Sequence, residues 1–189
     1  MEPEALSAVL TKCWEQFKAE YESGPHLAKS VGGGTPSCIH WSEADIQHRL
    51  ASLLEGMLED SPDLAVHLEL NLRVSTVDLA IVSAGKFNKP LQDGANSDFI
   101  RLVKATGGVE LAAEIAVLLD NNANSTYGRP KIEDNLFRLH KIRQEGLASL
   151  VCLFMLDKTG LPQVNDWVES LRREYADVLL LSVHDSMIK

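Results

Sequence analysis

The chain is poor in cysteine, in aromatic residues and in long apolar runs. Its 189 residues include three cysteines, and aromatic residues make up 6% of the total. Cys13, Cys38 and Cys152 form no CxxC pair, which argues against a disulfide framework or a zinc knuckle. No apolar run approaches the roughly 20 residues of a membrane span, and the first residues lack the basic and apolar regions of a signal peptide. We therefore expect a cytoplasmic protein without membrane contact.

Positive charge is also scarce. The 18 Lys and Arg residues stand against 27 Asp and Glu, so the formal net charge is −9. This balance excludes a protein that coats nucleic acid through bulk charge, but it leaves room for one local basic face. It also supplies carboxylates for a metal site. The length and the 45% apolar fraction favour a single globular domain over residues 1–189.

Hydrophobic periodicity indicates an α/β protein. Helical spacing of apolar residues predicts helices at 3–22, 42–58, 131–147 and 164–174. Alternating or continuous apolar runs predict strands at 65–74, 77–83, 109–119, 149–156 and 177–183. A Gly-rich loop is expected at 24–37, and a polar connection at 84–108 with a short helical patch at 98–104. We expect a mixed central sheet flanked by helices.

Three acidic residues lie where structure alone does not require them. Glu43 lies three residues before Ile46 on the inward stripe of its helix, although a place in the first turn also suits the helix dipole. Asp78 is the only charge in the strand 77–83, where Asp is disfavoured. Glu114 lies on the less apolar face of the strand that follows. Carboxylates that converge repel one another unless a cation holds them.

A hard divalent ion such as Mg²⁺ or Mn²⁺ fits such a cluster, because it binds carboxylates, water and substrate phosphate. It activates water and neutralises charge on a phosphodiester. Glu110 shares a face with Glu114 and could therefore enter the site, but we expect it at the solvent end of that strand.

The order of these elements and the positions of the acids resemble the PD-(D/E)XK nuclease superfamily, which has the restriction-endonuclease-like fold. The αβββαβ core of that fold would cover residues 40–160. The N-terminal helix with the Gly-rich loop, 1–38, and the C-terminal helix and strand, 161–189, lie outside it. The resemblance implies a metal-dependent nuclease that hydrolyses phosphodiester bonds, with DNA as the substrate.

The resemblance also assigns roles to single residues. Glu43 matches the acid of the first core helix, Asp78 the Asp of the second strand, and Glu114 the Glu of the third. The implied Mg²⁺ or Mn²⁺ ligands are Asp78, Glu114, Glu43 and the carbonyl of Ile115.

One position departs from the pattern. The superfamily places a Lys two residues after the Glu, and this chain has Ala116. An alanine can neither activate water nor steady developing charge. Three explanations stay open: a Lys removed to give an inactive enzyme, a basic group supplied from elsewhere such as Lys131 or Lys141, and a natural pseudo-nuclease that only binds.

The helix after Glu114 is locally basic. Its positive residues Arg129, Lys131, Arg138, Lys141 and Arg143 outnumber Glu133 and Asp134. Such a patch suits phosphate contacts, and we take Arg129, Lys131, Arg138 and Lys141 as candidate nucleic-acid-binding residues. The alternative is a solvated helix face with salt bridges.

Other chemistries have less support. His40 and His140 have no partner at metal-ligand spacing, no GxSxG elbow is present, and Cys152 lies in an apolar strand where thiols are inert. Besides a nuclease, two readings stay open. One is a non-catalytic module of the same fold that binds nucleic acid, a partner protein or a second copy. The other is an unrelated α/β domain whose acids never converge.

Overall fold

A five-stranded sheet organises the chain. The structure is a computed structural model that describes residues 1–23, 42–92, 98–118, 128–157, 159 and 161–184. The expected Gly-rich loop at 24–37 lies outside these residues. The helices are α1 (Pro3–Ser23), α2 (Glu43–Met57), α3 (Ala84–Gln92), α4 (Phe99–Thr106), α5 (Arg129–Gln144) and α6 (Pro162–Glu174). The strands are β1 (Leu64–Asn71), β2 (Thr76–Ser83), β3 (Val109–Leu118), β4 (Leu150–Asp157) and β5 (Leu179–His184).

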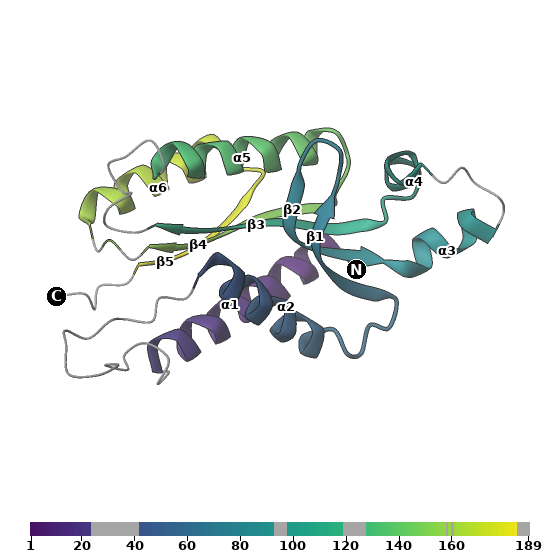
Figure 1. Cartoon of the computed structure of the whole chain (residues 1–189), viewed down its shortest axis with the longest axis horizontal. Coiled ribbons are helices and arrows are strands. Elements are labelled where there is room, and N and C mark those ends of the chain that lie inside the picture. The colour runs from purple at the N-terminus through teal and green to yellow at the C-terminus, as the bar shows by residue number, and fades with distance from the viewer. Residues whose placement is uncertain (24–41, 93–97, 119–127, 158, 160, 185–189) are drawn as a thin grey trace.

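The sheet is mixed, as expected. Its strand order is β1-β2-β3-β4-β5, with antiparallel pairing from β1 to β3 and parallel pairing from β3 to β5. Helices α1 and α2 lie on one face, and α5 and α6 cover the other (Figure 1). The prediction of an α/β protein with a mixed central sheet flanked by helices is confirmed. No helix in the described part of the chain is long and apolar enough to cross a membrane.

The alternation of β3 sorts its side chains between the two helical layers. Leu111, Ala113 and Ile115 belong to the core under α1 and α2. Ala112 and Ala116 belong to the core under α5 and α6. Side chains in a strand alternate between the two faces, so Glu110 and Glu114 point to the α5 side as well. The two acids of β3 therefore lie on the face of the sheet that the basic helix α5 covers.

A capping box fixes the start of α2. The backbone N–H of Asp45 donates to Ser42 Oγ at 3.2 Å, and the backbone N–H of Ser42 donates to Asp45 Oδ2 at 2.8 Å. Such reciprocal bonds satisfy N–H groups that a helix start leaves open. Because Ile46 and Leu50 anchor the next turns in the core, Glu43 is held in the first turn beside the sheet.

The structure differs from expectation between 84 and 108. The sequence predicted a polar connection with one helical patch, and the structure has both α3 and α4. Helix α3 was not predicted because it contains Gly85 and Pro90, which are poor helix formers. Phe87 and Phe99 stack with ring centroids 5.8 Å apart and join the two helices.

The turn between β1 and β2 is also longer than the sequence suggests. The strand predicted at 65–74 ends at Asn71, and a turn follows in which Arg73 has φ 66°. Val74 follows the apolar alternation of β1, which explains why the expected strand ran too far.

Candidate active site where β2 and β3 part

The site lies where two neighbouring strands separate. The β2–β3 ladder ends at the pair Leu79 and Ala113, while β2 goes on pairing with β1 and β3 goes on pairing with β4. In an antiparallel ladder the N–H and C=O of one residue point to the same neighbour. The N–H and C=O groups of Ile115 and Val117 therefore point towards a stretch of β2 that no longer pairs with β3.

Two carboxylates replace the missing ladder bonds. The N–H of Ile115 donates to Asp78 Oδ2 at 2.7 Å, and the N–H of Val117 donates to Glu43 Oε1 at 3.3 Å. Glu43 comes from the first turn of α2 and Asp78 from β2. Two of the three predicted acids thus meet at the same edge of β3, and each has a structural role there.

Glu114 joins Asp78 at this edge. The residue is only 4% exposed. Burial raises the pKa of Glu114 to about 8, and the neighbouring Asp78 charge adds to the rise while Arg138 opposes it. Burial also raises the pKa of Asp78, against the lowering effect of the Ile115 hydrogen bond. At neutral pH the Glu114 carboxyl keeps its proton and shares it with the Asp78 carboxylate in a hydrogen bond.

Arg138 of α5 lies against this acid pair. Its Nη1 is 3.1 Å from Glu114 Oε1 and also donates to Ser75 Oγ at 2.7 Å. Its Nη2 donates to Asn135 Oδ1 at 2.5 Å, and its Nε lies 3.2 Å from Asp134 Oδ2. Despite its closeness to Nη1, Glu114 Oε1 accepts no hydrogen bond within the described residues. Oε1 of the buried Glu114 carboxyl group can therefore accept a further hydrogen bond or bind a cation.

The four predicted phosphate-binding residues divide into two pairs. Lys131 Nζ forms an ion pair with Glu43, and Arg138 is held at Glu114, so both point into the acid cluster. Arg129 pairs with Glu133 one helical turn away, with Nε and Oε1 2.7 Å apart. Lys141 Nζ lies over the Phe137 ring, 4.7 Å from its centroid. The helix is thus both a solvated face with salt bridges and the source of two cations for the site.

Sequence reasoning missed Glu69 and Gln47. Gln47 Nε2 donates to Glu69 Oε1 at 2.8 Å and to the carbonyl of Asp78 at 2.5 Å. The Glu69 charge contributes to the raised pKa values of Asp78 and Glu114.

The backbone also singles out Glu69. Its neighbours Leu68 and Leu70 both pair with β2, but Glu69 itself, opposite Asp78, forms no ladder pair. Its φ is 54°. A positive φ at a residue other than Gly is strained, and such residues gather at functional sites. Glu69 fits the regular polar–apolar alternation of its strand, so the sequence does not mark it as a site residue. Gln47 could have been identified, because it lies one helical turn after Glu43 on the face towards the sheet.

Few donor groups in this cluster are available to an ion. No group of three or more His, Cys, Asp or Glu side chains is arranged to hold a metal among the described residues. Glu43 is already committed to Lys131 and to Val117. What remains is the Asp78–Glu114 pair and the carbonyl of Ile115, which points to the same side of β3 as its N–H. Two carboxylates with water and substrate phosphate are a usual Mg²⁺ set, so these groups fit that ion.

Glu110, expected at the solvent end of its strand, is instead 2% exposed. Its Oε1 lies 2.7 Å from Lys86 Nζ of α3. The expectation was wrong because it overlooked α3, the helix that covers this end of β3. Ala116 is buried in the core under α5 and α6.

Comparison with family models, with curated proteins and with solved structures finds no match to this chain.

Proposed function

We propose that the protein is a divalent-metal-dependent nuclease of the PD-(D/E)XK type, with DNA as the substrate. The observation that carries the proposal is the meeting of Asp78 and Glu114 beside Ile115, where β2 and β3 part. Apart from α3 and α4, which lie between β2 and β3, the elements from α2 to β4 also follow the αβββαβ order of the restriction-endonuclease-like core.

In this proposal Asp78, Glu114 and the Ile115 carbonyl hold Mg²⁺ or Mn²⁺. The ion supplies an activated water and a positive charge for the phosphodiester. Arg138 balances the charge of Glu114 and fixes its orientation through Ser75 and Asn135. Glu43 anchors Lys131 rather than binding the ion directly.

Lys131 takes the part that Ala116 cannot play. It lies at the start of α5, its Nζ contacts Glu43, and its side chain is 44% exposed, so it can reach a phosphate oxygen or a water. Lys141 is less suited, because its Nζ lies over Phe137. This arrangement supports a basic group supplied from another element over a Lys lost from position 116.

Cleavage assays on single- and double-stranded DNA with Mg²⁺ or Mn²⁺ test the proposal. Loss of an ion ligand in Asp78→Asn or of the basic group in Lys131→Met is expected to lower the rate about 100-fold or more. The matched control Lys141→Met is expected to keep the rate. Circular dichroism checks that each variant is folded. Cleavage that is absent in the parent chain and in Ala116→Lys would overturn the proposal.

A second candidate is a non-catalytic module on the same scaffold, which binds nucleic acid, a partner protein or a second copy. The Glu43–Lys131 ion pair and the proton that Glu114 shares with Asp78 favour it, since both reduce the negative charge of the cluster without a metal. This candidate predicts no heat on Mn²⁺ titration and no cleavage by any variant.

A further inference from the structure

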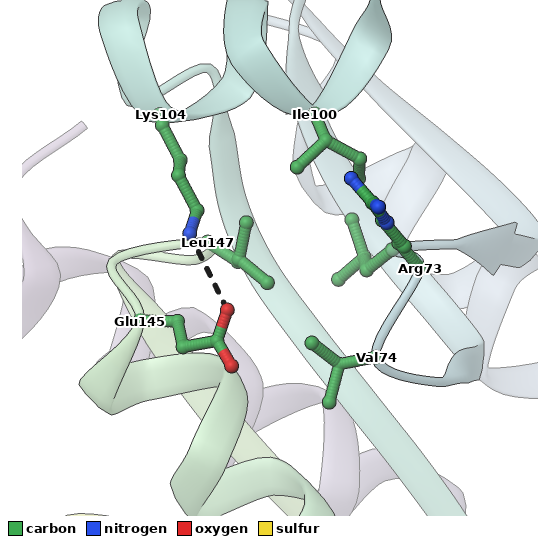
Figure 2. Close-up of a pocket in the computed structure, with 7 residues that line it drawn as sticks. Arg73, Val74, Ile100, Lys104, Glu145 and Leu147 are labelled. Carbon is green, nitrogen blue, oxygen red and sulfur yellow. Dashed lines mark hydrogen bonds and ion pairs between the residues drawn. The ribbon is translucent and has the colours of Figure 1, made fainter.

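A hollow lies apart from the acids, between three segments that are distant in sequence. It is lined by the hairpin turn, by α4, and by the end of α5 with the turn after it (Figure 2). The lining residues are Leu72, Arg73, Val74, Ile100, Lys104, Glu145 and Leu147. Its volume is about 330 Å³, which is at the small end of ligand sites.

The floor of this pocket is apolar. Leu72 and Leu147 are buried, Ile100 is partly buried, and Val74 is 37% exposed at the pocket wall. Val74, Leu72 and Leu147 together form an apolar surface on which a flat apolar group can lie. Such contact removes water from both the pocket floor and the bound group. The pocket therefore suits a ligand with a ring or other apolar body.

The rim of the pocket is positive. Lys104 Nζ lies 3.3 Å from Glu145 Oε2, so these two charges are paired (Figure 2). Arg73 adds a second cation, which extends from the hairpin turn towards Ile100. Within the described part of the chain its guanidinium forms no hydrogen bond or ion pair. A spare guanidinium on a chain of net charge −9 favours an anion, and its fork of N–H groups matches phosphate.

The backbone holds Arg73 in place at a cost. Its φ is 66°, a region that residues other than Gly, Asn and Asp rarely adopt. The N–H of Arg73 donates to Asn71 Oδ1 at 2.8 Å and secures this turn. Strained residues of this kind persist where the surroundings hold them and gather at binding sites.

We propose that this pocket binds a nucleotide, with its phosphate at Arg73 and its base on the floor formed by Leu72, Val74 and Leu147. A phosphate ester with a planar ring has the charge, the apolar body and the size that the pocket offers. Binding here does not depend on the nuclease proposal, because none of the lining residues belongs to the acid cluster.

The pocket nevertheless lies close to that cluster. Arg138 bonds to Ser75, the neighbour of Val74, and Glu145 follows Arg138 by two helical turns. Seven residues of helix span about 10 Å, so one nucleic-acid strand along α5 can reach both places.

Isothermal titration with adenosine 5′-monophosphate (AMP), inorganic phosphate and a single-stranded deoxyadenosine tetramer tests the pocket. AMP is expected to bind at least about tenfold more tightly than phosphate, because only AMP uses the apolar floor. Arg73→Asn, which keeps the backbone conformation, is expected to weaken AMP about tenfold or more. Val74→Ser is expected to weaken AMP and leave phosphate unchanged.

The matched control is Arg101→Gln, on the same helix as Lys104 but outside the pocket, which is expected to bind like the parent chain. If the tetramer depends on Arg73 as AMP does, the pocket holds one nucleotide of a strand. If only AMP depends on it, the pocket takes the free nucleotide. Absence of saturable AMP binding, equal affinity for AMP and phosphate, or an equal loss in Arg101→Gln would each overturn the proposal.

Discussion

Glu110 and Glu114 lie on the same strand and the same face, and both are buried, yet their surroundings differ. Glu110 has one partner of opposite charge, Lys86, whose Nζ also donates to the carbonyl of Gly107 at 3.1 Å. Glu114 lies beside a second carboxylate, Asp78, and shares an arginine with Asp134. Both positions of β3 thus bury an acid, and only the position of Glu114 gathers more acid than its cations balance.

The comparison teaches what separates an ion pair from a candidate site. A buried carboxylate with its own cation is a structural element. A pair of carboxylates that keeps a proton at neutral pH has room for a cation in place of that proton. The strand parting produces this difference, because it brings Asp78 to Glu114, whereas Glu110 lies at the irregularity in the β2–β3 register, beside α3 and Lys86.

The largest difference between the two glutamates is expected when each loses its cation, Lys86 beside Glu110 or Arg138 beside Glu114. Lys86→Met leaves a buried, charged Glu110 and is expected to cost about 3 kcal/mol of unfolding free energy. Arg138→Met should cost less at pH 7, because Glu114 keeps its proton there. Urea unfolding measures both. The double variant Lys86→Met/Glu110→Gln should recover most of the loss, and equal costs for the two single variants would contradict the distinction.

The pH dependence of stability separates the two glutamates next. The pKa of Glu114 is about 8 in the folded protein against an ordinary value of 4.5, so the folded state binds more protons between these values. Stability therefore falls as pH rises through this window, by at most about 1.4 kcal/mol per pH unit. Glu114→Gln should flatten this fall and raise stability at pH 8.5 by about 2 kcal/mol.

Thermal unfolding between pH 5 and 8.5 provides the measurement. Glu110→Gln is the matched control, since it neutralises the other buried acid of the same strand face. An unchanged pH slope in Glu114→Gln would show that Glu114 is ionised throughout.

The smallest expected effect concerns Glu69. Asn tolerates its positive φ and removes its charge, so Glu69→Asn should change stability by less than about 1 kcal/mol. Because the Glu69 charge raises the pKa of Glu114, the same substitution should move the midpoint of the pH-dependent fall to lower pH. A midpoint that does not move would place Glu69 outside the electrostatic reach of the pair.

Local patterns were sufficient to predict much of the fold. The alternation of β3, the apolar run of β4 and the capping box before α2 each depend on neighbouring residues. The same patterns placed Glu43, Asp78 and Glu114 on the elements where they are found. Helix α3 was missed because Gly85 and Pro90 interrupt its propensity, and its cover over Glu110 was missed with it.

Tertiary features of the site had no signal along the chain. The strained backbone of Glu69, the partnership of Lys131 with Glu43 and the inward turn of Arg138 depend on how distant segments meet. The charge of α5 was visible in sequence, but its division between the acid cluster and the solvent follows from the rotation of the helix against the sheet.

Titration of Mn²⁺ into the protein at pH 7, in two buffers of different ionisation enthalpy, tests the central claim most directly. If Asp78 and Glu114 form a cation site, Mn²⁺ binds and displaces about one proton from the pair. Asp78→Asn then loses the binding, and Glu110→Gln keeps it. Absence of binding heat in the parent chain, or equal Mn²⁺ affinity in Asp78→Asn, would contradict the claim and leave the acids as structural partners of Arg138 and of the β3 backbone.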